Sequence, residues 1–271
     1  MIPIDNPNDP QLQAYRATRD ADLLREQNLF MAEGRFIVRL LLGGGCRYSP
    51  NSLLVTQPAL DSLTDVLGAM SDKPIYLVPQ EIMNGITGFN IHRGCIAVCD
   101  RGPNLDAEKL LRSIPPGPAT LCILEDLANH DNVGGIFRNA AAFGCAGVLL
   151  SESCCDPLYR KAIRVSMGGC LTVPFTRLRI DSTRQMLHAL GFRIVALALR
   201  DNAVNISDAA ELLRGRVALM LGAEGPGLTD EALAAADAVV RIPINRGPGA
   251  VDSLNVAVAT GIALHQCSRR L

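Results

Sequence analysis

The sequence predicts an α/β protein with a mostly parallel sheet, preceded by a smaller α/β module. Apolar runs of strand length alternate with helical stretches through the second half of the chain, which is typical of a parallel sheet covered on both faces. The first part repeats this alternation with shorter strands, and Pro and Gly cluster between the two parts. We expect an N-terminal module over 1–100, a linker over 101–117 and a larger domain over 118–271.

The expected elements follow from runs of aliphatic and β-branched residues bounded by Gly and Pro. In the first module the expected strands are SLLVT, PIYLV and CIAVC, and the expected helices cover 11–28, 36–42, 59–70 and 81–84. In the larger domain the expected strands are TLCIL, GVLL, LTVPF, RIVALAL, RVALML and AVVRI. A last helix is expected from about Ser253 to Cys267.

The composition suits a folded protein that does not cross a membrane. Of 271 residues, 48% are hydrophobic and 20% are charged, which argues against disorder. No apolar run reaches the roughly 18 residues of a membrane span. The N-terminus MIPIDNPNDPQ lacks the basic start and apolar centre of a signal peptide. We expect a cytoplasmic protein.

The nine cysteines and four histidines are not spaced as a metal site. The closest cysteine spacings are Cys95 with Cys99 and the adjacent Cys154 and Cys155, and neither suits zinc. We interpret the cysteines as reduced, mostly buried thiols and expect no metal.

The charge pattern leaves the partner open. A net charge of −1 argues mildly against nucleic acid. However, only three of the 26 basic residues are Lys, and Arg can clamp phosphate and stack on bases. Six Arg fall in the first fifty residues. They form either a solvated helix face or a phosphate-binding surface.

Three segments have unusual content where strands end, which is where open α/β sheets bind ligands. The first is HDNVGGIFRNAAAFG, residues 130–144. We expect Asn132, Gly134 and Gly135 in a turn, since Asn can hydrogen-bond its own turn and Gly permits close backbone approach. A helix is then expected from Phe137.

The strand before this segment ends on two acids, Glu125 and Asp126, and the helix after it carries Arg138. Arg138 is expected one turn into this helix, close to its N-terminal end. The helix dipole makes that end partly positive, so a cation is unfavourable there. Arg138 therefore indicates a bound anion, with a plain surface Arg behind an ordinary cap as the alternative.

The second segment is LMLGAEGPGLTDEAL, residues 219–233. A buried strand leads into a Gly-rich turn that holds Glu224. It is neither a P-loop nor a GxGxxG motif. Such a turn exposes backbone N–H and C=O groups to an adenine or a ribose. A tight strand-to-helix turn with Thr229 as cap is the alternative.

The third segment is IPINRGPGAVDSLNVAVATGIALH, residues 242–265. A strand ends at Pro243, and a helix is expected with Ser253 as its N-cap. Asn255 is unusual there because Asn is a poor interior helix residue. The small residues that follow predict close packing against the sheet or another subunit.

In this order and spacing, the three segments resemble the signature motifs of the SpoU/TrmH branch of the SPOUT RNA methyltransferases. The family's first motif matches Asn132, Gly134, Arg138, Phe143 and Gly144; its second matches 221–228; its third matches Ile242, Pro243 and 253–259. A further family-like segment matches Arg164, Ser166, Gly168 and Pro174. The resemblance spans about residues 118–268.

The resemblance implies a C-terminal SPOUT domain with a deep trefoil knot and an N-terminal substrate-binding module. S-adenosylmethionine (SAM) would bind in the knot, held largely by main chain. The implied cofactor-binding residues are Leu221, Gly222, Gly225, Ile242 and Leu254. The resemblance also implies a homodimer in which Arg138 reaches the SAM bound by the partner subunit.

The implied reaction is methyl transfer from SAM to a ribose 2′-hydroxyl of structured RNA. Ribosomal RNA is favoured over tRNA, since the tRNA-specific relatives tend to lack the N-terminal module. The implied catalytic residues are Asn132, Arg138, Glu224, Ser253 and Asn255.

The alternative function is a non-catalytic RNA-binding or ribosome-assembly factor that keeps the fold. The five candidate catalytic residues favour the enzyme. The loop between Pro243 and Ser253 is longer than the family's usual turn and favours the alternative.

Overall fold

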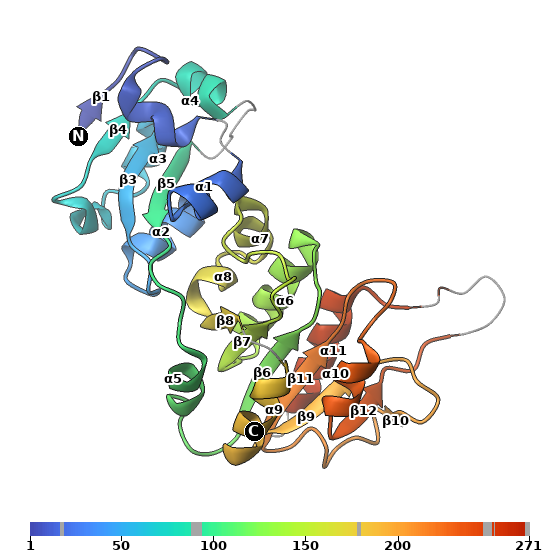
Figure 1. Cartoon of the computed structure of the whole chain (residues 1–271). Coiled ribbons are helices and arrows are strands. Elements are labelled where there is room, and N and C mark those ends of the chain that lie inside the picture. Colours follow the sequence, from blue (N-terminus) through green and yellow to red (C-terminus); the bar gives the residue numbers. More distant parts are fainter. Residues whose placement is uncertain (17–18, 88–93, 178–179, 246–250, 252, 269–271) are drawn as a thin grey trace. The chain divides into compact units, whose positions relative to one another are not determined.

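A computed structural model describes residues 1–16, 19–87, 94–177, 180–245, 251 and 253–268. The chain divides into two compact units (Figure 1). The first unit is Met1–Pro103 with Leu158–Thr172, and the second is Asn104–Pro157 with Val173–Leu271. Among the described helices, none is long and apolar enough to cross a membrane.

The first unit holds a mixed five-stranded sheet in the order β1-β4-β3-β5-β2. Its strands are β1 (Ile2–Pro3), β2 (Leu29–Glu33), β3 (Pro50–Val55), β4 (Ile75–Leu77) and β5 (Cys95–Asp100). β5 runs antiparallel to β2 and β3, and the remaining pairs are parallel. Helical elements join them: η1 (Pro10–Tyr15), α1 (Asp20–Glu26), α2 (Arg35–Leu42), α3 (Gln57–Asp61), η2 (Leu67–Met70) and α4 (Gln80–Thr87).

Two predicted helices of this unit were wrong in detail, and strands β1 and β2 were not predicted. The helix expected over 11–28 is two elements, η1 and α1, because the chain is extended at Arg16. The helix expected over 59–70 is split into α3 and η2. Strand β2 was not predicted, since a short apolar run does not distinguish a strand from a buried helix.

The first unit also contains α7 (Arg160–Val165) and α8 (Gly169–Thr172), which come late in the chain. Arg160 binds Asp20 twice: its Nε lies 2.6 Å from Oδ1, and its backbone N–H donates to Oδ2 at 3.0 Å. Glu33 lies 3.6 Å from Arg160 and 3.5 Å from Arg164. Burial raises the pKa of the Glu33 carboxyl, and the two guanidinium groups oppose that shift. These contacts anchor α7 within the unit.

The family-like segment around Ser166 builds the turn between α7 and α8. The Ser166 hydroxyl oxygen accepts from the backbone N–H of Cys170 at 3.2 Å. Gly168 has a φ of +84°, and a Cβ there would lie 2.6 Å from Leu40 Cδ2. The strand predicted over 171–175 is therefore wrong at its start, since the chain is helical to Thr172.

The second unit holds a seven-stranded sheet in the order β10-β12-β9-β11-β6-β7-β8, and each pair of neighbouring strands runs parallel. Its strands are β6 (Ala119–Leu124), β7 (Gly147–Leu150), β8 (Phe175–Arg177), β9 (Arg193–Leu197), β10 (Val204–Asn205), β11 (Arg216–Leu221) and β12 (Ala238–Arg241). Its helices are α5 (Ala107–Arg112), α6 (His130–Ala142), α9 (Ile180–Ala189), α10 (Asp230–Ala235) and α11 (Val256–Ser268). The predicted mostly parallel sheet is confirmed.

Side chains alternate between the two faces of this sheet. Leu121 of β6 and Met220 of β11 share one buried cluster with Leu111 of α5, Leu187 of α9 and Ala232 of α10. The other helices, α6 and α11, pack against each other and contact β7 and β11. The sheet is therefore a rigid layer whose carboxyl edge can hold a site.

All nine cysteines are free thiols, and seven of them are buried. Burial raises the pKa of the Cys155 thiol to about 12 and also raises the pKa of Cys99. These thiols stay protonated at neutral pH and pack as small apolar side chains.

Candidate active site

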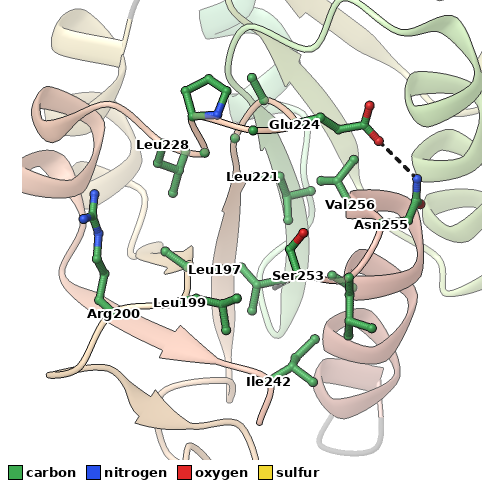
Figure 2. Close-up of a pocket in the computed structure, with 18 of the residues that line it drawn as sticks. Leu197, Leu199, Arg200, Leu221, Glu224, Leu228, Ile242, Ser253, Asn255 and Val256 are labelled. Carbon is green, nitrogen blue, oxygen red and sulfur yellow. Dashed lines mark hydrogen bonds between the residues drawn. The ribbon is translucent and has the colours of Figure 1, made fainter. Parts of the chain in front are cut away.

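A pocket of about 640 Å³ opens at the carboxyl edge of the second unit's sheet. Strands β12, β9 and β11 are parallel neighbours, so their last residues meet at this edge (Figure 2). The lining residues come from three stretches, 197–200, 221–228 and 242–259 with gaps. Two of these are the second and third segments that the sequence singled out.

Asn255 joins all three segments through its side chain. Its Oδ1 accepts the N–H groups of Ala257 at 3.0 Å and Val258 at 3.3 Å, which caps the start of α11. Its Nδ2 donates to Asn132 Oδ1 at 2.8 Å and to Glu224 Oε1 at 3.3 Å. Figure 2 shows the bond to Glu224. The single side-chain amide of Asn255 thus connects α6, the Gly-rich turn and the start of α11.

This arrangement corrects the predicted start of the last helix. Ser253 was expected to be the N-cap, but the helix begins at Val256 and Asn255 caps it. The same chemistry that makes Asn a poor interior residue makes it a good cap, because its carbonyl competes for free backbone N–H groups. Ser253 instead lines the pocket.

The first segment is helical where a turn was predicted. Helix α6 begins at His130, and Asn129 caps it by accepting from the N–H of Asp131 at 2.8 Å. Asn132 therefore lies in the first helical turn, 3% exposed. Its Nδ2 is buried and finds no hydrogen-bond partner among the described residues.

Gly134 and Gly135 are helical rather than part of a turn, and Gly135 serves helix packing. Both lie inside α6. A Cβ at Gly135 would lie 2.7 Å from the Cβ of Ala257 on α11. On the same helix, Asn139 Nδ2 donates to the carbonyl of Ala257 at 2.7 Å. Because Gly135 has no methyl group, the two helices can approach closely enough for that bond.

The Gly-rich turn folds back on itself to form one pocket wall. A Cβ at Gly222 would lie 2.3 Å from the carbonyl carbon of Gly227, so only Gly fits there. Gly225 and Gly227 have φ values of +86° and +74°, which Gly adopts without strain. The Gly227 N–H closes the turn on the Ala223 carbonyl at 3.0 Å.

Most of the side chains that line the pocket are apolar, and the polar ones include Arg200, Glu224, Ser253 and Asn255. Leu197, Leu221, Leu228 and Ile242 supply an apolar floor. Arg200 and Glu224 are the charged side chains among the described lining residues, and Figure 2 shows them at opposite sides. Arg200 lies 3.7 Å from the exposed Asp230, a weak surface pair.

The stretch from Leu197 to Arg200 was missed by the sequence analysis. It begins at the last residue of β9, and Asp201 and Asn202 directly follow it. Those two polar residues at a strand end are a signal that could have found it. The other signal is sheet order, since β9 lies between β11 and β12, and that order cannot be read from the sequence.

The predicted site residues fall into three groups. Eight of them line the pocket: Leu221, Gly222, Glu224, Gly225, Ile242, Ser253, Leu254 and Asn255. Asn132 is outside the lining set and joins it through Asn255. Arg138 is separate from both.

Arg138 does not contribute to the pocket of its own chain. It lies more than two turns from His130, in the middle of α6 rather than near its positive end. The side chain is exposed, and within the described part of the chain no carboxylate pairs with it. The prediction that Arg138 lies near the positive end of the helix is therefore wrong, although its exposed guanidinium remains available to an anion.

Comparisons with known proteins place these segments within one family. A model described as the SpoU rRNA Methylase family matches residues 119–265. An uncharacterized tRNA/rRNA methyltransferase of Mycobacterium tuberculosis is 38% identical over 270 residues, which cover 97% of this chain and 90% of the relative. A 23S rRNA (guanosine-2′-O-)-methyltransferase RlmB of Coxiella burnetii is 31% identical over 215 residues, covering 78% of this chain and 82% of the relative.

Solved structures agree with both units. The AdoMet-bound rRNA methyltransferase from Sinorhizobium meliloti has a TM-score of 0.81 and 26% sequence identity, and the match covers 99% of this chain and 98% of that one. The family model includes the three converging segments and more than half of the 271 residues. The chain therefore belongs to the SpoU rRNA methylase family.

Proposed function

We propose that the protein is a SAM-dependent methyltransferase that modifies a ribose 2′-hydroxyl of structured RNA, with ribosomal RNA favoured over tRNA. The observation that carries the proposal is the meeting of Asn132, Glu224 and Asn255 beside one pocket. Two relatives supply support by name, a 23S rRNA (guanosine-2′-O-)-methyltransferase and an AdoMet-bound rRNA methyltransferase.

The pocket fits SAM by volume and by chemistry. Its volume of about 640 Å³ lies within the roughly 300–1,000 Å³ of small-molecule sites. The apolar floor suits an adenine ring, and the Gly-rich turn places backbone groups at the wall. Leu221, Gly222, Gly225, Ile242 and Leu254 would hold the cofactor.

SAM supplies a methyl group on a positively charged sulfur, which already makes the methyl carbon electrophilic. The protein's task is then alignment and help for a weakly acidic hydroxyl. Asn255 and Glu224 lie at one side of the pocket and would orient the ribose. Asn132 does not line the pocket and would act by holding Asn255 in place through its Oδ1.

Arg138 would act on the pocket of the partner subunit. Its exposure and its absence from the pocket of its own chain support this assignment. A guanidinium stays charged in proteins, so Arg138 would anchor a phosphate and stabilise the developing alkoxide rather than take the proton. Leu254 and Val258 are exposed near the start of α11. They would pack against the partner subunit in the proposed homodimer.

The first unit would select the RNA. Folded RNA is read by shape and through single-stranded loops. Arg19, Arg25, Arg35 and Arg47 are exposed in this unit and can meet phosphate. A dimer would present two such surfaces despite the net charge of −1.

The direct test is donor binding followed by product mapping. Calorimetric titration with SAM should show saturable binding in the micromolar range. Ribosomal RNA from a strain that lacks the gene should accept one methyl group at a ribose 2′-oxygen when incubated with protein and SAM. Absence of binding at high micromolar SAM would favour the non-catalytic RNA-binding function.

Arg138→Ala should abolish methyl transfer while SAM affinity stays within a few-fold of wild type. SAM affinity should change little because Arg138 does not line the pocket of its own chain. Methyl transfer should be lost because Arg138 would no longer stabilise the developing alkoxide at the partner's pocket. Transfer is measured with tritiated SAM and affinity by calorimetry. Near-normal turnover of the variant would show that Arg138 has no role in the reaction.

A further inference from the structure

The two acids at the end of β6 have no role in the function proposed so far. Each of them bonds a different neighbour. Glu125 accepts from Thr229, which follows the Gly-rich turn after β11. Asp126 accepts from Ser151 and Ser153 in the segment after β7. Since β6 lies between β11 and β7, the two carboxylates diverge toward the two neighbouring strands.

The Glu125 carboxylate binds Thr229 at two points. Its Oε2 accepts the backbone N–H at 2.9 Å, and its Oε1 accepts the hydroxyl at 2.8 Å. The same hydroxyl oxygen accepts the N–H of Ala232 at 3.1 Å, which caps α10. The hydroxyl proton is therefore free to point to Glu125, and the two bonds fix both position and orientation of Thr229.

Thr229 is the exit of the turn that forms a pocket wall. Leu228, directly before it, is 5% exposed and lines the pocket. Gly227, one residue earlier, packs against Gly222. At the entry of the turn, the Glu125 N–H donates to the Leu221 carbonyl at 2.9 Å. Glu125, the residue directly after β6, therefore bonds both ends of the turn.

We infer that Glu125 is a positioning residue that holds the wall of the methyl-donor pocket in its binding shape. Glu125 is not among the residues that line the pocket, so it acts through the turn. The turn has a second tie, from Glu224 through Asn255 to Asn132. Both ties end on the continuous segment from β6 into α6. The inference rests on the proposed function of the pocket as the donor site.

The test compares Glu125→Ala with a matched control, Asp126→Gly. The control removes the neighbouring carboxylate, and Gly suits the φ of +55° at that position. Both variants lose hydrogen bonds to a neighbouring loop, but only the first loses bonds to the pocket wall. Glu125→Gln is the rescue variant, because its amide can still accept the Thr229 N–H.

Two readouts are measured on the full-length protein. The first is calorimetric affinity for S-adenosylhomocysteine, the product of the donor. We expect Glu125→Ala to weaken it between about three- and tenfold, the effect of losing a partly exposed charge-assisted pair of bonds. Glu125→Gln and Asp126→Gly should stay within about twofold of wild type. Equal affinity of Glu125→Ala and wild type would overturn the inference.

The second readout needs no ligand. Hydrogen exchange of the backbone amides over 222–229 should be faster in Glu125→Ala than in Asp126→Gly, because only the former frees the turn. Unchanged exchange there would also overturn the inference. If wild-type protein bound no S-adenosylhomocysteine, the proposed donor site would be wrong, and the exchange comparison would still decide whether Glu125 holds the turn.

Discussion

Asn255 shows how one side chain can have a structural and a chemical role at once. Its carbonyl oxygen caps α11, and its amide nitrogen contacts Asn132 and Glu224. The sequence analysis identified Asn255 as unusual and placed it inside the helix, since propensity ranks residue types and does not locate the first turn. The cap becomes visible only when the direction of its carbonyl is known.

Substitutions at Asn255 should separate these two roles. Asn255→Ala should lower the free energy of unfolding by about 1 kcal/mol through loss of the cap and should also reduce turnover. Asn255→Ser keeps a capping oxygen but lacks the two amide protons, so it should keep most of the stability and lose turnover. Thermal melts and methyl-transfer rates measure the two effects. Equal rates for Asn255→Ser and wild type would leave Asn255 as a cap alone.

At the scale of elements, the contact between α6 and α11 positions the site. Asn132 lies on α6 and Asn255 at the start of α11, so the distance between the two helices sets their hydrogen bond. Gly135 and Ala257 determine that distance, with Gly261 close to Asn139 on the next turn. The run of small residues in α11 predicted close packing, and the structure identifies α6 as the neighbour within the chain.

Gly135→Ala should push α6 and α11 apart. Overpacking of about 1–3 kcal/mol exceeds the gain of up to about 1 kcal/mol in helix propensity, so the melting temperature should fall and donor affinity with it. Adding Ala257→Gly makes room for the new methyl group and should restore donor affinity. Gly85→Ala in α4 is the control, because a Cβ at Gly85 would meet no atom within 4 Å. A comparable loss of melting temperature and donor affinity in that variant would contradict the packing explanation.

At the scale of the whole molecule, we propose that a second chain completes the site. The pocket, Asn132 and Asn255 belong to one chain, while Arg138 is exposed and does not line that pocket. In the proposed homodimer with two-fold symmetry, each Arg138 would act at the pocket of the partner subunit. The threading of the C-terminal segment into a knot stays a prediction from the family resemblance.

Complementation between two variants with impaired methyl transfer tests this assembly. Arg138→Ala and Asn255→Ala are coexpressed with different tags, and the mixed dimer is purified over both. If Arg138 acts across the interface, one of the two sites is complete, and the mixed dimer should have about half of the wild-type rate. If Arg138 acts within its own chain, both sites are defective and the mixed dimer should be as inactive as its parents.

Much of this protein was determined by local sequence. The alternation of apolar runs predicted the parallel sheet, because side-chain period and strand length are properties of neighbouring residues. The three polar segments were identified by residue types that ordinary turns and helices do not need. Even the two acids after β6 were evident, although their partners were not.

The tertiary structure decided what these segments do to one another. Asn255 and Asn132 are 123 positions apart, and Glu125 and Thr229 are 104 apart. Their contacts depend on strand order, which follows from packing whole faces and has no local signature. For the same reason, the stretch after β9 joined the pocket without any motif of its own, and Gly135 proved to be a packing residue.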